Sequence, residues 1–167
     1  NISQKAKKVV FVGTFTAGNL EIALEAGVLK ILADGKAMKF VNEVEHRTFS
    51  GPVAAVSGKT VLYVTERCVF RLCAEGLELI EIAPGIDLRR EILDRMEFAP
   101  LMRQPPALMD ARIFSAEPMG LRPGLLEMPL EQRLSYDAAQ NVFFVNFEGL
   151  SVRSRADIDR ILAAVES

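Results

Sequence analysis

Tryptophan is absent from this sequence of 167 residues, and histidine and cysteine are nearly so, because His46 is the only imidazole and Cys68 and Cys73 are the only thiols. So few nitrogen and sulfur ligands do not make a zinc site, and we expect no metal. His46 has no evident nucleophile or orienting partner for general-base catalysis. The two cysteines are five positions apart in a strand-like run, which puts them on opposite faces. We therefore expect reduced thiols and a cytoplasmic protein.

A surplus of either charge is also missing. Acidic residues number 22 and basic residues 20, which gives a net charge of −2. Without excess positive charge to meet phosphates, we expect no nucleic-acid partner and no membrane partner. The longest apolar runs, such as Val9–Val12, are far too short to span a bilayer, and no signal peptide is visible. A composition of 50% hydrophobic and 25% charged residues is that of an ordinary globular domain, alone or with an appendage.

The first 99 residues are expected to form one β-rich unit. The pattern predicts a strand at Lys8–Phe15 and a hairpin within Leu20–Leu32 that turns at Ala26-Gly27. A helix at Leu20–Glu25 remains an alternative to the first strand of that hairpin. The β-branched and aromatic content of Lys39–Phe49 favours a further, partly exposed strand.

Three short apolar runs follow two breaks, at Ser50-Gly51-Pro52 and at Ser57-Gly58. Their regular spacing indicates an antiparallel meander with strands at 60–65, 68–73 and 77–82. After the meander, Asp87 is a predicted N-cap for an amphipathic helix that Pro100 closes.

The last third of the chain has a different texture. Six of the eight prolines lie in residues 100–129, where they disfavour a helix or sheet interior, yet the segment is rich in leucine and methionine. We predict an apolar, proline-rich arm there. Residues 130–167 are predicted to add a β-hairpin, with strands at Arg133–Tyr136 and Asn141–Phe147, and a final amphipathic helix. Ser154 and Asp157 resemble a capping box at the start of that helix.

One loop is a candidate ligand site. Gly13–Gly18 lies at the end of the first predicted strand and has the glycine spacing of a phosphate loop. Asn19 and Leu20 stand where that motif has Lys and Ser or Thr, so a nucleoside triphosphate is not expected. Small residues after a strand leave backbone N–H groups and the hydroxyls of Thr14 and Thr16 free to approach a ligand. A plain tight turn is the alternative.

Several longer phrases occur in one order along the chain. They are VVFVGTFTAG at 9–18, FSG at 49–51, VLYVTER at 61–67, VF at 69–70, GL at 76–77 and EIAPGIDL at 81–88. On these phrases the chain resembles the C-terminal part of a family I coenzyme A transferase of the single-chain acetate/propionate type (acyl-CoA:acetate/3-ketoacid CoA transferase). The resemblance runs from about residue 1 to about residue 122.

The resemblance implies a fold, a reaction and partners. The fold would be the C-terminal part of an open α/β domain, locally α+β and β-rich with antiparallel strands, plus a small C-terminal hairpin–helix unit. Such enzymes pass CoA between an acyl-CoA and a short-chain carboxylate through a glutamyl-CoA thioester, in short-chain fatty acid or ketone body metabolism. The expected partners are these two substrates, the remainder of the same polypeptide and further copies in a homo-oligomer.

The resemblance also assigns residues. The nucleophilic Glu would lie upstream of this chain, so the chain alone is expected to be inactive and to hold no catalytic residue. Glu66 belongs to the VTER turn instead, where we expect a solvated ion pair with Arg67. Because ligands favour the C-terminal ends of strands in α/β sheets, the candidate CoA-binding residues are Thr14, Thr16, Gly18 and Asn19.

Two points qualify this assignment. Asn19 replaces a Gly that is usual in the family, and Asn tolerates left-handed backbone geometry better than most residues. A second hypothesis is a non-catalytic assembly module, in which the apolar arm and the terminal hairpin–helix unit pack subunits of the transferase together.

Overall fold

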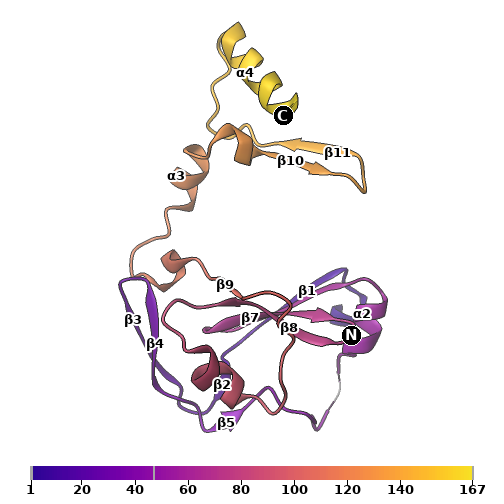
Figure 1. Ribbon diagram of the computed structural model, residues 1–167, viewed down its shortest axis with the longest axis vertical. Helices are drawn as coiled ribbons and strands as arrows, with labels where there is room; N and C mark the ends of the chain where they lie inside the picture. The colour runs from indigo at the N-terminus through magenta and orange to yellow at the C-terminus, as the bar shows by residue number, and fades with distance from the viewer. Residues whose placement is uncertain (1, 47, 167) are drawn as a thin grey trace. The chain divides into compact units, whose positions relative to one another are not determined.

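The computed structural model describes residues 2–46 and 48–166. The chain divides into two compact units, Asn1–Pro118 and Met119–Ser167 (Figure 1). The division predicted from the sequence, at residues 99/100 and 129/130, groups the chain differently and stays a prediction. No helix among the described residues is both long enough and apolar enough to cross a membrane.

The first unit is built on a five-stranded mixed sheet (Figure 1). Its strands, in spatial order, are β1 (Lys8–Val12), β6 (Thr60–Val64), β7 (Cys68–Cys73), β8 (Gly76–Ile82) and β9 (Ala107–Leu108). The pairs β1–β6 and β8–β9 are parallel, whereas β6, β7 and β8 form the predicted antiparallel meander. The α/β class with antiparallel strands is confirmed.

Two small ribbons flank this sheet. β3 (Glu21–Glu25) and β4 (Val28–Ala33) form the predicted hairpin, so the alternative helix is wrong. Its turn uses left-handed backbone at Ala26 and Gly27, with φ of 51° and 80°. The second ribbon pairs β2 (Thr16–Ala17) with β5 (Ala37–Met38) in antiparallel fashion.

The strand predicted at Lys39–Phe49 is wrong for the described residues of that range. The backbone of this segment is hydrogen-bonded to Glu97, which is distant in sequence. Glu97 donates its N–H to Phe40 O, and its carboxylate accepts the N–H of Asn42. Arg47 lies outside the described residues. The first strand is also shorter than predicted and ends at Val12.

The sequence predicts a break at Ser50-Gly51-Pro52, whereas the structure has the helix α2 (Gly51–Val56) there. Ser50 is its N-cap and accepts the N–H of Val53. Proline is well tolerated in a first helical turn, where its missing N–H has no intrahelical partner. A shorter helix, α1 (Ile2–Lys5), precedes β1.

The predicted helix after Asp87 is present but short. One π-helical turn, η1 (Leu88–Ile92), leads into a 3-10 turn, η2 (Leu93–Arg95), well before Pro100. Asp87 Oδ1 accepts the N–H of Arg90 at 2.7 Å, which confirms the N-cap. A second 3-10 turn, η3 (Ala111–Phe114), ends the ordered elements of the first unit.

Both faces of the main sheet are covered by apolar side chains. Along β7, Cys68 and Phe70 belong to one buried cluster and Val69 to another, as the period of two requires. The first cluster includes Phe15 and Ile92, and the second includes Leu29, Met109 and Phe114. Cys68 and Cys73 are free thiols on opposite faces.

The second unit contains the predicted hairpin and helix. Its elements are α3 (Leu121–Leu126), η4 (Leu130–Arg133), β10 (Leu134–Asp137), β11 (Val142–Val145) and α4 (Arg155–Glu166). The capping box is confirmed, since Asp157 Oδ2 accepts the N–H of Ser154 and Ser154 Oγ accepts the N–H of Asp157. Leu150–Arg153 is irregular.

Candidate functional site

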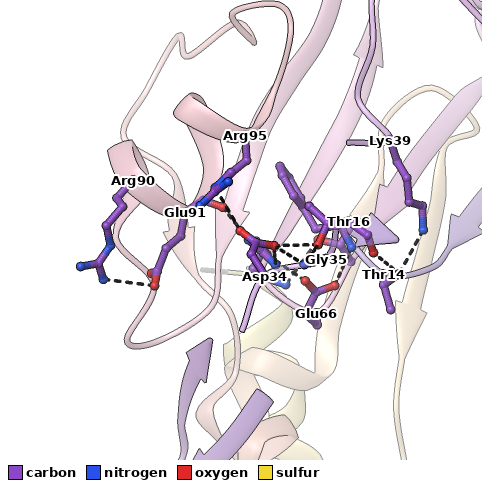
Figure 2. Close-up of polar contacts among 12 residues, drawn as sticks. Thr14, Thr16, Asp34, Gly35, Lys39, Glu66, Arg90, Glu91 and Arg95 are labelled. Atoms are coloured by element: carbon purple, nitrogen blue, oxygen red, sulfur yellow. Dashed lines mark hydrogen bonds and ion pairs between the residues drawn. The ribbon is translucent and has the colours of Figure 1, made fainter. Parts of the chain in front are cut away.

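The loop from Thr14 to Asn19 follows β1 at the edge where the parallel strands β1 and β6 end. Thr14, Gly18 and Asn19 are exposed. Thr14 Oγ1 donates to Thr16 O at 2.7 Å and accepts from Lys39 Nζ at 3.1 Å (Figure 2). Gly18 and Asn19 have left-handed backbone, with φ of 82° and 63°. Asn19 therefore occupies the left-handed geometry expected for it.

Thr16 does not fit the sequence prediction that its hydroxyl is free. The residue is 1% exposed, and its Oγ1 donates to Asp34 Oδ1 at 2.7 Å and accepts the N–H of Gly35 at 3.0 Å (Figure 2). The hydroxyl instead ties the loop to the turn between β4 and β5. CoA binding by the loop stays a prediction, and Thr14, Gly18 and Asn19 are its accessible members.

Arg67 also departs from the sequence prediction, which expected a solvated ion pair. Its side chain is 0% exposed. The guanidinium donates to both oxygens of Asp34, at 3.1 and 3.4 Å, and to Glu66 Oε1 at 2.8 Å. A further bond reaches the backbone oxygen of Glu91 at 2.9 Å, and Arg95 lies 3.1 Å from Asp34 on the other side. The expected surface pair is in fact the centre of a buried network.

The network sets the charge state of its members. Burial alone would raise the pKa of Asp34, but hydrogen bonds from Arg67 and Thr16 and the charges of Arg67 and Arg95 outweigh it and lower the pKa. Burial likewise opposes the charge of Arg67, yet Asp34 and Glu66 raise its pKa. Asp34 and Arg67 therefore stay ionised inside the fold.

This network also holds the backbone of the candidate loop. The N–H of Phe15 donates to Glu66 Oε2 at 2.7 Å, and the Phe15 ring lies under the guanidinium of Arg67, with 4.8 Å from Cζ to the ring centroid. Gly35 closes the other side, because a Cβ there would lie 2.6 Å from Ala17 O. Phe15, Thr16 and Ala17 are thus fixed from both sides, while the rest of the loop faces outward.

Sequence reasoning missed three members of this region: Asp34, Lys39 and Arg95. The sequence patterns give Asp34 no role, and they place Lys39 in a predicted strand. No local pattern connects them, since Asp34 and Arg67 are 33 positions apart. A buried Arg beside a single carboxylate would have pointed to a second acid, but nothing in the sequence shows that Arg67 is buried.

A cleft of about 590 Å³ opens beside the loop, at the C-terminal ends of β1 and β6. Phe11 and Tyr63 from these strands line the cleft, together with Thr14 and Lys39. His46 is exposed and does not line this cleft.

Comparisons with known proteins agree with the motifs. No protein-family model matches the chain. The acetate CoA-transferase YdiF of Escherichia coli (strain K12) is 47% identical over 120 residues, which cover 72% of this chain and 23% of that enzyme. The caffeate CoA-transferase of Acetobacterium woodii is 47% identical over 121 residues, again 72% and 23% of the two chains.

A solved structure shows the same relationship. The acyl-CoA transferase YdiF of E. coli O157:H7, crystallised as a thioester complex with CoA, matches with a TM-score of 0.69 and 47% identity over 71% of this chain and 23% of that chain. The chain is therefore similar to the C-terminal part of coenzyme A transferases, as the sequence phrases predicted. It spans 23% of the length of these relatives.

Proposed function

We propose that this chain is the C-terminal part of an enzyme that moves CoA between an acyl-CoA and a short-chain carboxylate, and that it acts in the cytoplasm. In this role its sheet completes an α/β half of the enzyme, and the loop from Thr14 to Asn19 faces CoA. The observation that carries the proposal is the 47% identity over 120 residues to a CoA-transferase. The same fold in an enzyme solved as a thioester complex with CoA supports it.

The chemistry proposed is covalent, through a glutamyl-CoA thioester on a Glu that this chain does not contain. Glu66 contacts the loop directly, and both of its oxygens are engaged, one by Arg67 and one by the N–H of Phe15. A carboxylate held as an ion-pair partner is a poor nucleophile because its charge is already stabilised. The chain alone should therefore show no CoA transfer, and measurable transfer by it would contradict this division of labour.

The loop is suited to a ligand in specific ways. Thr14 is exposed, and left-handed backbone at Gly18 and Asn19 turns the chain without a bulky side chain at Gly18. Its position at the C-terminal ends of parallel strands is where α/β sheets bind ligands. Phe15 and Thr16 are held by the buried network, so the exposed groups are pre-organised.

Titration of CoA into the 15N-labelled chain tests the loop. We expect shifts of the backbone amides at Thr14, Gly18 and Asn19, with Thr14→Ala weakening the response. The matched control is Thr60→Ala, an exposed threonine at the opposite end of the β1–β6 pair. Absence of shifts in the loop, or equal effects of the two variants, would count against CoA contact there.

Subunit packing is a second candidate function, favoured by one observation on the second unit. Among its described side chains none of the apolar ones is buried, and Arg133 is the buried residue, donating to backbone oxygens such as those of Leu126 and Glu148. Exposed apolar side chains on the hairpin and on α4 include Phe143, Phe144, Ile158 and Leu162. Such a unit gains stability when a partner covers it.

The size of the full chain in solution tests this role. If the second unit packs subunits of a homo-oligomer, light scattering should give a multiple of 18.4 kDa, and Leu162→Glu on α4 should reduce that mass. A mass that is the same for the parent and the variant would contradict the packing role.

A further inference from the structure

The cleft beside the loop has the size and lining of a small-molecule site. Its volume of about 590 Å³ falls in the range of ligand pockets, which are mostly apolar with a few polar groups. Four half-buried aromatic rings line it, from Phe11, Phe40, Tyr63 and Phe98. Phe11 and Tyr63 are stacked on each other, with ring centroids 5.2 Å apart and planes 23° apart, so they form one continuous apolar part of the lining.

One charge is present in this cleft. Among its described lining residues Lys39 is the charged side chain, and no acid lines the space with it. Lys39 Nζ donates a hydrogen bond to Thr14 Oγ1 at 3.1 Å. It forms no ion pair with any described carboxylate. Lys39 is exposed, so its amine is accessible to a ligand in the cleft. The cleft therefore offers a single positive charge at one side of an aromatic surface.

The walls are fixed without a ligand. Glu97 donates its N–H to Phe40 O at 3.0 Å, and Asn42 donates its N–H to Glu97 Oε2 at 2.9 Å and its amide Nδ2 to Glu97 O at 3.1 Å. The Phe40 ring also packs on the buried rings of Phe15 and Phe70, with centroid-to-centroid distances of 4.8 and 4.9 Å. A preformed site loses little conformational entropy when it binds.

We propose that this cleft binds a monocarboxylate with an apolar body of about the size of a phenylalkyl group. The carboxylate is held by Lys39 Nζ and Thr14 Oγ1, and the body lies against Phe11 and Tyr63. A single cation suits one negative charge, whereas the several phosphate charges of CoA call for more donors. The cleft adjoins the Thr14–Asn19 loop, so the ligand's role as a substrate rests on the proposed function, while its binding does not.

Calorimetric titration of the full chain with 3-phenylpropionate tests the proposal. We expect binding at least about thirtyfold tighter than that of acetate, because the ring adds buried apolar surface. Lys39→Met should weaken the affinity about tenfold, through loss of a charge-assisted hydrogen bond. Lys8→Met is the control, since Lys8 is an exposed lysine at the other end of β1, and it should leave the affinity unchanged. Equal affinities for the two carboxylates, or equal effects of the two variants, would overturn the proposal.

Charge reversal gives a second, independent readout. Lys39→Glu should lose its affinity for 3-phenylpropionate and gain affinity for 3-phenylpropylamine, which has the same apolar body and the opposite charge. Binding of the amine that is no tighter in this variant than in the parent would also overturn the proposal. The titration with CoA separates this proposal from the proposed function. If the chain binds the carboxylate but CoA does not shift the amides of the loop, only the proposed CoA contact of the loop is refuted. If CoA shifts those amides but the carboxylate does not bind, only the present inference is refuted.

Discussion

Replacing Arg67 by methionine tests whether the buried ion network stabilises the first unit and its loop. The guanidinium is 0% exposed, and its removal leaves the carboxylates of Asp34 and Glu66, 14% and 13% exposed, without their shared cation. Breaking a buried pair by removing one partner costs about 3–5 kcal/mol. Because Arg95 still contacts Asp34, we expect a loss of unfolding free energy near the lower end, about 3 kcal/mol.

The matched control is Arg89→Met, because that arginine is 81% exposed and pairs with Asp94 at the surface. A surface pair of this kind contributes about 0–1 kcal/mol. Hydrogen exchange of the β7 amides reports the opening of the first unit separately from the second, so it measures both variants on the same scale. The Phe15 amide should also shift in Arg67→Met, since Glu66 loses the partner that orients it.

Equal costs of the two substitutions would refute this reasoning. That result would mean that the carboxylates of the network are solvated once Arg67 is gone, and that the network neither stabilises the fold nor holds the loop.

Three further predictions follow from the same region and from the thiols. Asp34 has a pKa below its unfolded value of 3.8, so its ionisation stabilises the fold above that value and the contribution is lost as the pH falls through the lowered pKa. The difference in urea stability between the parent and Asp34→Asn should therefore be large near neutral pH and shrink on acidification; a constant difference would contradict it. In thermal unfolding, Gly35→Ala should lower the stability of the fold by about 1–3 kcal/mol, because the new Cβ would lie 2.6 Å from Ala17 O. Gly51→Ala is the control and should leave the stability unchanged, because its Cβ would make only an ordinary contact at 3.5 Å. Burial raises the pKa of the Cys68 thiol to about 12, so in mass spectrometry iodoacetamide should label Cys73 first, and early labelling of Cys68 would refute its burial.

Much of the fold was predictable because its signals are local. The meander of β6, β7 and β8 follows from three apolar runs separated by turn residues, and the β3–β4 hairpin from a pattern broken at Ala26-Gly27. The capping box before α4 needed only Ser154 and Asp157, three positions apart. Each of these features depends on residues close together in sequence.

The predictions were wrong where the local structure depends on residues that are distant in sequence. The strand predicted at Lys39–Phe49 fails because Phe40 and Asn42 bond to Glu97, and no sequence pattern announces that contact. The network around Arg67 was likewise hidden, since a Glu-Arg dipeptide in a turn is usually solvated. Its burial depends on Asp34 from another turn, so only the tertiary structure reveals it.

The candidate site was predictable in place but not in detail. The glycine-rich phrase after the first strand identified the loop, and family resemblance gave it a ligand. The sequence did not distinguish exposed Thr14 from Thr16, whose hydroxyl is used inside the fold. It also did not show that Lys39 and four aromatic rings meet beside the loop.

An exchange of segments tests the central claim most directly, namely that this chain carries the C-terminal part of a CoA transferase. Residues 1–118 would replace the matched segment of the E. coli acetate CoA-transferase YdiF, and CoA transfer to acetate would be assayed beside the parent enzyme. The account predicts a folded chimera that transfers CoA. A folded chimera that retains the rest of the enzyme but transfers no CoA would contradict it.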